Sequence, residues 1–386
     1  MWISTARPSS AAVVSLADAL DLGPGVWDEL LGRSGTPGPF MTWAWHRAWT
    51  EGAEADAVES ARALVLRSAA GELEALFPFR VYRTQFRRVP VNVLGWAIGD
   101  VGCPDHLELP ASPDADLGAL VGALEDVPWD VIVLSNVADG ASNIDRFAAA
   151  CGRRRWKTRR TPLWHCPYLH LPVSWDDYLS CLSANRRQTI QRKERKLCRE
   201  HQVAFSDYGA SRLDEGWRHL RRLHGLRWGG AGAFRAPGLE RLHKGFASAL
   251  AGRGQLWLTT LDVDGAPVAA WYGFSFADTV YFYQGGWDPH WEHYSVGTIL
   301  MGVMIRRAIE RRYRVFDFLR GAEPYKMAWT FTARTCYELL VIRPGWRGAT
   351  LRCLDWMATR RAVRWLRPTT GWFRHGRGEE VDRERA

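Results

Sequence analysis

Two segments, about half the chain length apart, share one pattern of apolar runs around a glycine-containing turn. Residues 63–82 read ALVLRSAAGELEALFPFRVY, and residues 256–276 read LWLTTLDVDGAPVAAWYGFSF. In the second segment, Asp264-Gly265 favours a two-residue turn, because both residue types accept a positive φ. We therefore expect a β-hairpin in each segment.

Each predicted hairpin is followed by a segment with helical periodicity and then by a further apolar strand. In the first copy these are residues 117–127 and 129–137, and in the second they are residues 296–313 and 314–319. The recurrence predicts a duplicated α/β unit, that is, two mixed, twisted sheets flanked by helices. The expected divisions are an N-terminal unit over residues 1–160, a C-terminal unit over 161–345, and a basic C-terminal helix and tail over 346–386.

The remaining apolar periodicity is helical and surrounds these two units. The helices are expected over residues 27–50, 176–200 with a break near 183–185, 211–226 and 238–251. The link between the two units is expected near residues 155–165.

The amino-acid composition indicates the class of protein and its cellular compartment. Nearly half of the residues are apolar and 21 are Trp, which is typical of a globular chain with a large core. The seven Cys residues are dispersed without any C-x-x-C spacing, which favours a reducing compartment over a disulfide framework. The N-terminus lacks a signal-peptide core, and no apolar run reaches the length of a membrane span. We therefore expect a cytoplasmic protein.

The net charge of +9 is concentrated in a few basic segments. Such clusters suggest an anionic partner, although a solvated basic surface gives the same pattern. The basic helix near residues 186–199 has no interleaved aromatic residues for base stacking, so tRNA is an alternative partner that we do not favour. The apolar stripe of residues 350–368 is flanked by Arg, and it either packs on the protein or makes peripheral contact with an anionic membrane.

The predicted helix after residue 295 has features of an anion site in the second copy alone. Ser295 is a candidate N-cap, and Gly297 lies in the first turn, where backbone N–H groups lack partners within the helix. Such a helix start suits a phosphate. The corresponding start in the first copy, ASPDADLGALVG, carries three acids that would repel one.

Several segments in order resemble one family. They are PFMTWAWHRAW (residues 39–49), WDDYLSCLSANRRQTIQRKERKL (175–197), YSVGTIL (294–300) and FDFLRGAEPYKMAW (316–329). Together they resemble the CelD-type branch of the GNAT acyltransferases, which is related to the FemAB-like aminoacyltransferases. The resemblance implies two tandem GNAT-type folds with the active unit on the C-terminal side. It also implies acetyl-CoA or another acyl-CoA as the donor, or an aminoacyl-tRNA as in the FemAB-like relatives.

The resemblance and the residue chemistry together nominate a site. Donor binding is expected at Ser295, Val296, Gly297 and Thr298. Tyr325 occupies the place from which GNAT folds often protonate the departing thiolate. Asp317 is the candidate general base, although it could instead pair with Arg320 or Lys326.

The other nominated residues are polar side chains near the same strand ends. Arg320 could hold a substrate anion through its planar guanidinium, with Lys326 beside it. Glu323, Tyr283 and Gln284 are expected to line the acceptor side. No metal site is expected, because the 11 His are dispersed and no local Cys/His spacing occurs.

Three functions stay open from the sequence. The first is transfer of an acyl group, such as acetyl, from acyl-CoA to an amine or hydroxyl acceptor in polysaccharide or cell-envelope biosynthesis. The second is a FemAB-like transferase that uses aminoacyl-tRNA. The third is a non-catalytic GNAT-fold scaffold in exopolysaccharide synthesis.

Overall fold

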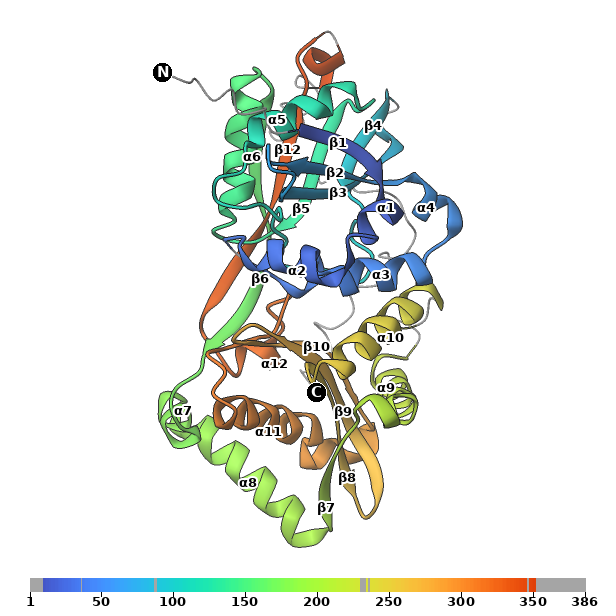
Figure 1. The fold of residues 1–386 in the computed structure, drawn as a ribbon. Coiled ribbons are helices and arrows are strands. Elements are labelled where there is room, and N and C mark those ends of the chain that lie inside the picture. The colour runs from blue at the N-terminus through green and yellow to red at the C-terminus, as the bar shows by residue number, and fades with distance from the viewer. Residues whose placement is uncertain are drawn as a thin grey trace.

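The protein is an elongated molecule in which the two halves of the chain lie end to end (Figure 1). The computed structural model describes residues 10–35, 37–86, 89–229, 234, 237–345 and 347–351. Residues 352–386, which hold most of the predicted C-terminal helix and tail, lie outside the described residues. Within the described residues, no helix is both long enough and apolar enough to cross a bilayer.

The N-terminal half contains the first predicted hairpin, helix and strand. Its elements are β1 (Ser10–Ser15), α1 (Leu16–Leu20), α2 (Gly23–Gly32), the 3₁₀ helix η1 (Pro39–Met41), α3 (Trp43–Gly52), α4 (Ala55–Ser60), β2 (Ala61–Arg67), β3 (Leu73–Phe86), β4 (Val89–Trp96), α5 (Leu117–Ala123), η2 (Leu124–Asp126), β5 (Val131–Val137), α6 (Ser142–Arg153) and β6 (Lys157–His170).

The C-terminal half repeats that order after additional helices. Its elements are α7 (Trp175–Cys181), α8 (Ala184–Glu200), β7 (Val203–Asp207), η3 (Ala210–Arg212), α9 (Leu213–Trp228), α10 (Pro237–Gly252), β8 (Leu256–Val263), β9 (Ala266–Phe276), β10 (Thr279–Trp287), η6 (Pro289–Tyr294), α11 (Val296–Glu310), β11 (Val315–Asp317), α12 (Pro324–Met327) and β12 (Ala333–Ile342).

Both predicted hairpins are confirmed. β2 pairs with β3, and β8 pairs with β9, each in antiparallel register. The β8–β9 turn has φ of 51° at Asp264 and 82° at Gly265, as a two-residue turn between twisted strands requires. The expected break before the basic helix is also confirmed, between α7 and α8.

The two halves exchange their last strands. In each half a parallel pair follows the hairpin, β4 with β5 and β10 with β11. The described strands form one sheet in the order β1-β2-β3-β4-β5-β12-β6-β11-β10-β9-β8-β7. The last strand of the C-terminal half therefore lies beside β5, and the last strand of the N-terminal half lies beside β11. The expected mixed α/β sheet flanked by helices is confirmed.

Because of this exchange, the segment predicted to link the two halves is itself a strand of the sheet. Residues 155–165 were expected to be a connection, but most of them belong to β6, which pairs with β12 along residues 157–167 and with β11 along residues 168–170. The strand runs from one half into the other in Figure 1. The backbone hydrogen bonds of β6 thus tie the halves together.

Two helices cover opposite faces of the C-terminal sheet. Alternation along β9 directs Trp271 toward the core beneath α11, whereas Ala270 and Tyr272 face the core beneath α9. α11 is apolar on most of its surface and is buried along most of its length. The sheet end between these two helices is where the candidate site lies.

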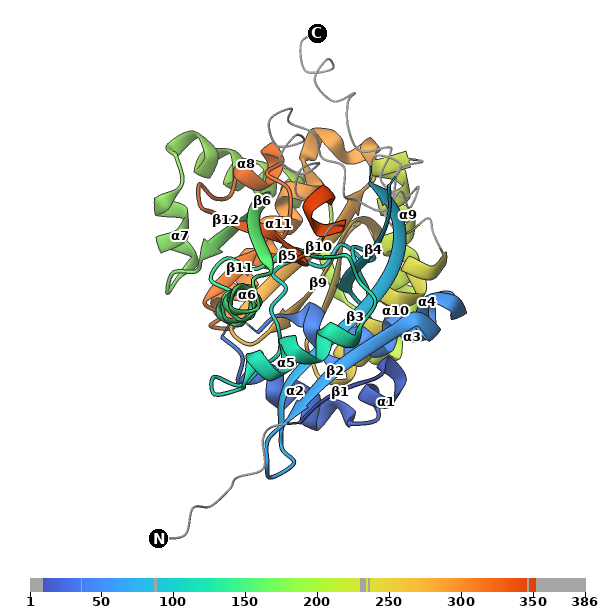
Figure 2. The same cartoon turned by 90° about the horizontal axis from the view of Figure 1, so that it is seen from above.

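The largest apolar core spans the junction between the halves. α10 lies beside α3 in both Figure 1 and Figure 2, and the Phe246 ring contacts the Trp45 ring edge-on at 5.0 Å. Leu242 of α10 and Leu319, which follows β11, belong to the same core as α3. Burial of this surface opposes separation of the halves.

A buried ion pair also crosses the junction. Arg320 Nε lies 2.8 Å from Asp105 Oδ1, and Arg320 Nη1 lies 3.1 Å from Asp100 Oδ1. Arg320 Nη2 donates to the Pro104 carbonyl at 2.6 Å. Asp105 is fully buried, and burial raises its pKa to about 6 although Arg320 opposes the rise. The carboxyl therefore depends on Arg320 for its charge.

We expect Arg320→Met to lower the free energy of unfolding by about 3 kcal/mol or more, because it leaves Asp105 buried without its cation. Urea unfolding at neutral pH measures this loss. The matched control is Arg314→Met, which removes an exposed Arg 3.8 Å from Asp278 and should change stability by less than about 0.5 kcal/mol. Equal effects of the two substitutions would contradict the role of Arg320.

Candidate active site

The parallel strands β10 and β11 separate partway along their length. Their register runs from Thr279 opposite Val315 to Tyr281 opposite Asp317, where β11 ends while β10 continues to Trp287. A β-bulge between Phe282 and Gln284 bends β10 at the same point. The second half of β10 consequently borders an opening in place of a neighbouring strand.

A cavity of about 400 Å³ occupies this opening. Its lining combines strand, helix and loop residues: Arg186, Arg227, Trp228, Ala270, Trp271, Phe282, Gln284, Gly285, Gly286, Trp287, Glu292, Ser295, Gly297, Thr298, Leu300, Met301, Tyr325, Ala328 and Trp329. Five of the residues nominated from the sequence are in this set: Gln284, Ser295, Gly297, Thr298 and Tyr325. The structure thus brings the predicted donor segment and the predicted proton donor to one cavity.

The start of α11 forms one wall, with a different cap from the one expected. Ser295 has a left-handed backbone (φ 58°), and its side chain makes no capping hydrogen bond. Its carbonyl accepts from the Thr298 and Ile299 N–H groups instead. The positive end of the helix dipole therefore faces the cavity, with the Ser295 hydroxyl on the cavity wall.

Val296 and Gly297 differ from expectation in their contacts. Val296 is fully buried and packs in the core rather than lining the cavity. A Cβ on Gly297 would lie 3.0 Å from Trp287 Cδ1, so the glycine admits the indole ring. The absence of a side chain at Gly297 serves this packing, in addition to leaving the helix start open.

α9 reaches the cavity because its backbone lies directly on β10. A Cβ on Gly286 would lie 2.3 Å from the His224 backbone nitrogen, so only glycine allows this approach. His224 Nε2 then lies 3.2 Å from Gln284 Oε1. Burial lowers the pKa of His224 to about 4, so the ring is neutral and donates to the amide oxygen. The amide nitrogen of Gln284 remains to donate toward the cavity.

Two Arg residues give the cavity a cationic rim. The Arg227 guanidinium lies over the rings of Trp228, Trp287 and Tyr325 at 4.6, 5.4 and 5.2 Å from their centroids. Arg186 of α8 lies 4.9 Å over the Trp329 ring. Stacking on aromatic rings helps to hold both guanidinium groups at the rim of the cavity, where their positive charge can attract an anion.

Tyr325 is arranged to keep its proton. It lies on the short helix α12, and burial raises the pKa of its hydroxyl well above the ordinary value, with Glu323 adding to the rise and Arg227 opposing it. A protonated phenol at a cavity wall can donate to a departing anion.

Asp317 lies on the other side of the strand. It is opposite to Phe316 and Phe318, as alternation predicts, but that face points to the junction of the halves. Its carboxylate lies 3.2 Å from His106 Nε2 and 3.2 Å from an Arg334 nitrogen. These groups, rather than Arg320 or Lys326, are its ion-pair partners, and together they lower its pKa against the effect of burial.

The remaining nominated residues also face the junction or the surface. Arg320 binds Asp100 and Asp105 where a substrate anion was expected. Lys326 Nζ donates to the Arg320 carbonyl at 2.6 Å and lies 3.0 Å from the half-exposed Glu323 carboxylate. The Tyr283 hydroxyl donates to the Gly102 carbonyl at 2.7 Å. These four residues do not line the cavity.

Arg186, Arg227 and His224 are cavity-associated residues that the sequence analysis did not nominate. Each lies on a helix remote in sequence from α11, and α9 comes close only through Gly286. Arg227 and Trp228 precede a glycine-rich segment, RWGGAGAF, which is the one local signal that could have drawn attention to them.

Comparison with known proteins supports this geometry. Residues 184–327, which include all of the cavity-lining residues except Ala328 and Trp329, match the family model described as an acetyltransferase (GNAT) domain. The match lies within the C-terminal half and spans less than half of the chain, so this segment is similar to that family. No curated protein sequence matches the chain.

Solved structures share the fold over nearly the whole chain. The FemX crystal structure aligns with a TM-score of 0.56 at 9% identity, covering 86% of this chain and 98% of FemX. L-PGS from Bacillus licheniformis aligns with a TM-score of 0.51 at 12% identity, covering 86% and 96%. The C-terminal domain of a putative lysylphosphatidylglycerol synthetase from Agrobacterium fabrum gives 0.51 at 11% identity, covering 89% and 97%. These likenesses show a common fold of the two halves.

Buried neutral histidines predict how stability depends on pH. Burial lowers the pKa of His46 and His224 to about 4 and that of His243 to about 3. The unfolded chain binds these protons near pH 6.5 but the folded chain does not, so stability is lost as the pH falls from 6.5 toward 4.

We expect His224→Gln to reduce this loss by up to about 1.4 kcal/mol per pH unit relative to wild type. Urea unfolding between pH 6.5 and 4 measures the two slopes. His290→Gln, at an exposed position, is the control and should leave the slope unchanged. A His224→Gln slope equal to that of wild type would show that His224 is protonated in the folded state.

Proposed function

We propose that the chain is an acyltransferase that moves an acyl group from acyl-CoA to an amine or hydroxyl acceptor. The observation that carries the proposal is the cavity between the separated strands β10 and β11, at the positive end of α11 and within the matched GNAT domain. An acyl-CoA needs a cationic place for its phosphates, a slot for its extended arm and a proton source for its thiolate.

Two different walls of the cavity offer groups that could bind the phosphates and the extended arm of the donor. The start of α11 together with Arg186 and Arg227 supplies positive charge for the pyrophosphate. The backbone of β10 beyond Tyr281, where β11 has ended, can pair with the amide groups of an extended donor. Glu292 of η6 is the acidic residue in the cavity lining, and its charge would repel phosphate groups. We therefore place the phosphates on the side of the cavity that Arg186 and Arg227 border.

The chemistry follows from two further side chains. The acceptor attacks the thioester carbonyl, and the carbonyl oxygen gains charge that the Gln284 amide N–H, oriented by His224, can stabilise. When the carbon–sulfur bond breaks, the Tyr325 hydroxyl donates its proton to the sulfur. The acceptor loses one proton in the same reaction, which restores the proton of Tyr325. A role for Asp317 as the base stays a prediction.

The nature of the acceptor rests on the resemblance to the CelD-type branch. That resemblance favours a polysaccharide or a cell-envelope precursor, whose hydroxyl and amine groups are both suitable nucleophiles. The donor is expected to be acetyl-CoA, because Trp271, Phe282 and Leu300 leave limited apolar volume in a cavity of about 400 Å³.

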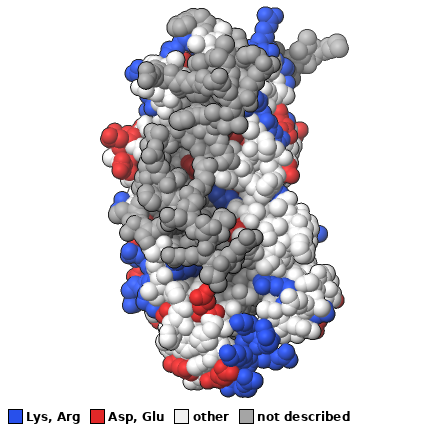
Figure 3. Space-filling model, turned by 180° about the vertical axis from the view of Figure 1, so that it is seen from behind, with Lys and Arg blue, Asp and Glu red and all other residues white. Residues whose placement is uncertain are grey.

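One observation favours a second candidate, transfer from aminoacyl-tRNA. α8 contributes Arg186 to the cavity rim and exposes Arg192, Arg195 and Arg199 on its outer side. Figure 3 shows Lys and Arg gathered at the end of the molecule that α8 occupies. A cationic helix leading to the cavity suits an RNA backbone. The likeness to FemX and to the lysylphosphatidylglycerol synthetases is compatible with this candidate.

We expect Tyr325→Phe to lower turnover by about 10²-fold or more while donor affinity and the unfolding temperature change little, because only the proton-donating hydroxyl is removed. Acyl transfer to a panel of amine and hydroxyl acceptors measures turnover. Tyr313→Phe, on a Tyr that packs against Trp257 away from the cavity, is the matched control. Unchanged turnover in Tyr325→Phe would remove Tyr325 from the mechanism.

We expect wild-type protein to bind acetyl-CoA saturably and Arg227→Met to weaken binding by about tenfold, because the substitution keeps the apolar stem but removes the charge. Calorimetric titration measures both. Arg311→Met, at the far end of α11, is the control.

The same titration separates the donors. Absence of acetyl-CoA binding, together with salt-sensitive tRNA binding that is lost when Arg192, Arg195 and Arg199 are replaced by Gln, would favour the tRNA candidate. Absence of both, with function retained in Tyr325→Phe, would favour the non-catalytic scaffold.

A further inference from the structure

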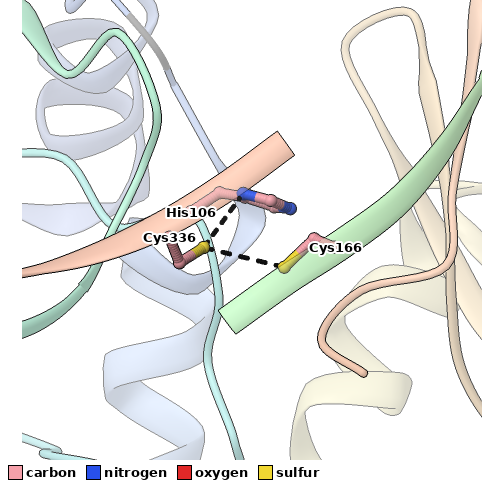
Figure 4. Close-up of side chains that lie close together, drawn as sticks. All are labelled: His106, Cys166 and Cys336. Carbon is pink, nitrogen blue, oxygen red and sulfur yellow. Dashed lines mark hydrogen bonds between the residues drawn. The ribbon is translucent and has the colours of Figure 1, made fainter. Parts of the chain in front are cut away.

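Three potential metal ligands meet in the buried junction, outside the cavity. His106 lies in the loop between β4 and α5, Cys166 on β6 and Cys336 on β12, and all three side chains are buried. One ligand atom from each lies within 4.8 Å of the others. Figure 4 shows the two sulfur atoms and the imidazole directed toward one another from three separate segments.

Two of the spacings among these atoms match those of one tetrahedral centre. Zn²⁺ binds Cys sulfur at about 2.3 Å and His nitrogen at about 2.0–2.1 Å, so tetrahedral angles separate two sulfurs by about 3.8 Å and a sulfur from a nitrogen by about 3.6 Å. The Cys166 and Cys336 sulfurs lie 3.7 Å apart, and Cys336 Sγ lies 3.5 Å from His106 Nδ1. Both distances are therefore within about 0.1 Å of those expected for a tetrahedral zinc site.

The second nitrogen of His106 has the partner that a metal-bound imidazole uses. Nε2 lies 3.2 Å from Asp317 Oδ2, and the other Asp317 oxygen accepts the Leu319 N–H at 2.7 Å. A carboxylate beside Nε2 favours the tautomer with its proton on that nitrogen, which leaves the Nδ1 lone pair for a metal ion. This geometry also explains why an acid lies in the middle of the apolar strand FDF.

The charges around the cluster balance when a divalent cation is bound. Two thiolates neutralise a divalent ion, and Arg334 offsets Asp317 at 3.2 Å. Asp105 and Asp100 are already paired with Arg320. The cation therefore leaves no isolated buried charge beside β6 and β12.

The backbone around the cluster is held in an uncommon conformation. His106 has φ of 55°, Cys103 in the same loop has φ of 45°, and Leu319 next to Asp317 has φ of 56°. Non-glycine residues in this region cost free energy and persist where the surroundings require them. Here the strain serves to direct His106 and Asp317 toward the two strands.

We propose that His106, Cys166 and Cys336 bind one Zn²⁺ ion, oriented by Asp317, that cross-links the exchanged strands β6 and β12 to the N-terminal half. Binding releases to solvent the protons held on the two sulfurs and on His106 Nδ1, so that two thiolates and a neutral imidazole face the ion. A small ligand such as water completes the coordination. The ion holds the junction together and lies on the face of β11 away from the cavity, so its role is structural.

The test uses the full chain purified under reducing conditions. We expect about one zinc ion per chain by elemental analysis, since a buried site with two thiolate ligands retains zinc through purification. After removal of zinc with a chelator, titration with Co²⁺ should give thiolate-to-cobalt charge-transfer absorption and the visible bands of a tetrahedral site, saturating at one ion. Adding Zn²⁺ back should abolish these bands and raise the unfolding temperature by several degrees.

Variants assign the ligands. Cys166→Ser and Cys336→Ser should lose the charge-transfer bands, and Asp317→Asn should keep them but weaken Zn²⁺ affinity by about 10–100-fold. The matched control is Cys151→Ser, a buried Cys on α6 outside the cluster, which should bind as wild type does.

Two results would overturn the proposal, and both use the wild-type chain, so a misfolded variant cannot obscure them. The first is a reduced protein that contains no zinc and gives no cobalt bands. The second is a zinc-free protein whose unfolding temperature does not change when Zn²⁺ is added back.

Discussion

The antiparallel pairing of β6 with β12 is the constraint on which the rest of the structure depends. Each of these strands closes one half of the chain in sequence, yet each lies next to the other half in the sheet. Because the pairing register is fixed residue by residue, it also fixes where the ends of β11 and β12 meet the loop of residues 100–106. Arg320, Asp317 and Cys336 reach their partners across the junction through this register.

The end of β11 then separates two environments by alternation and by the bulge in β10. One side holds the cavity, where aromatic rings position Arg227 and a helix start faces open space. The other side holds buried polar groups in which Arg320 pairs with Asp105 and Asp317 lies beside His106. Alternation along β10 separates even adjacent residues, since Gln284 lines the cavity while the hydroxyl of the partly buried Tyr283 donates to the Gly102 carbonyl of the N-terminal half. The N-terminal half consequently supports the site, while the described cavity-lining residues all come from the C-terminal half.

The sequence predicted more of the fold than of the site. Hairpins, the duplicated order of elements and the broken basic helix all depend on local patterns, and each was found near its predicted place. Within the site, Tyr325, Gln284 and the start of α11 were predicted correctly as neighbours. Arg320 and Asp317 were expected near the same cleft, but the face of β11 that carries Asp317 points to the junction of the halves, and the Arg320 guanidinium pairs with Asp105. The Ser295 hydroxyl was expected to cap α11, but the left-handed backbone prevents this.

The sequence by itself determined the elements and their repetition, because hydrophobic periodicity, turn residues and glycine act over a few positions. Only the tertiary structure decided which elements became neighbours. Nothing in the sequence distinguishes Gly286 from the rest of the 36 glycines, because its importance comes from the close approach of α9. The exchanged strands β6 and β12 are likewise more than 160 residues apart in the chain. His106, Cys166 and Cys336 showed no metal-ligand spacing for the same reason: their proximity comes from strand pairing and burial across the chain, which leave no local pattern in the sequence.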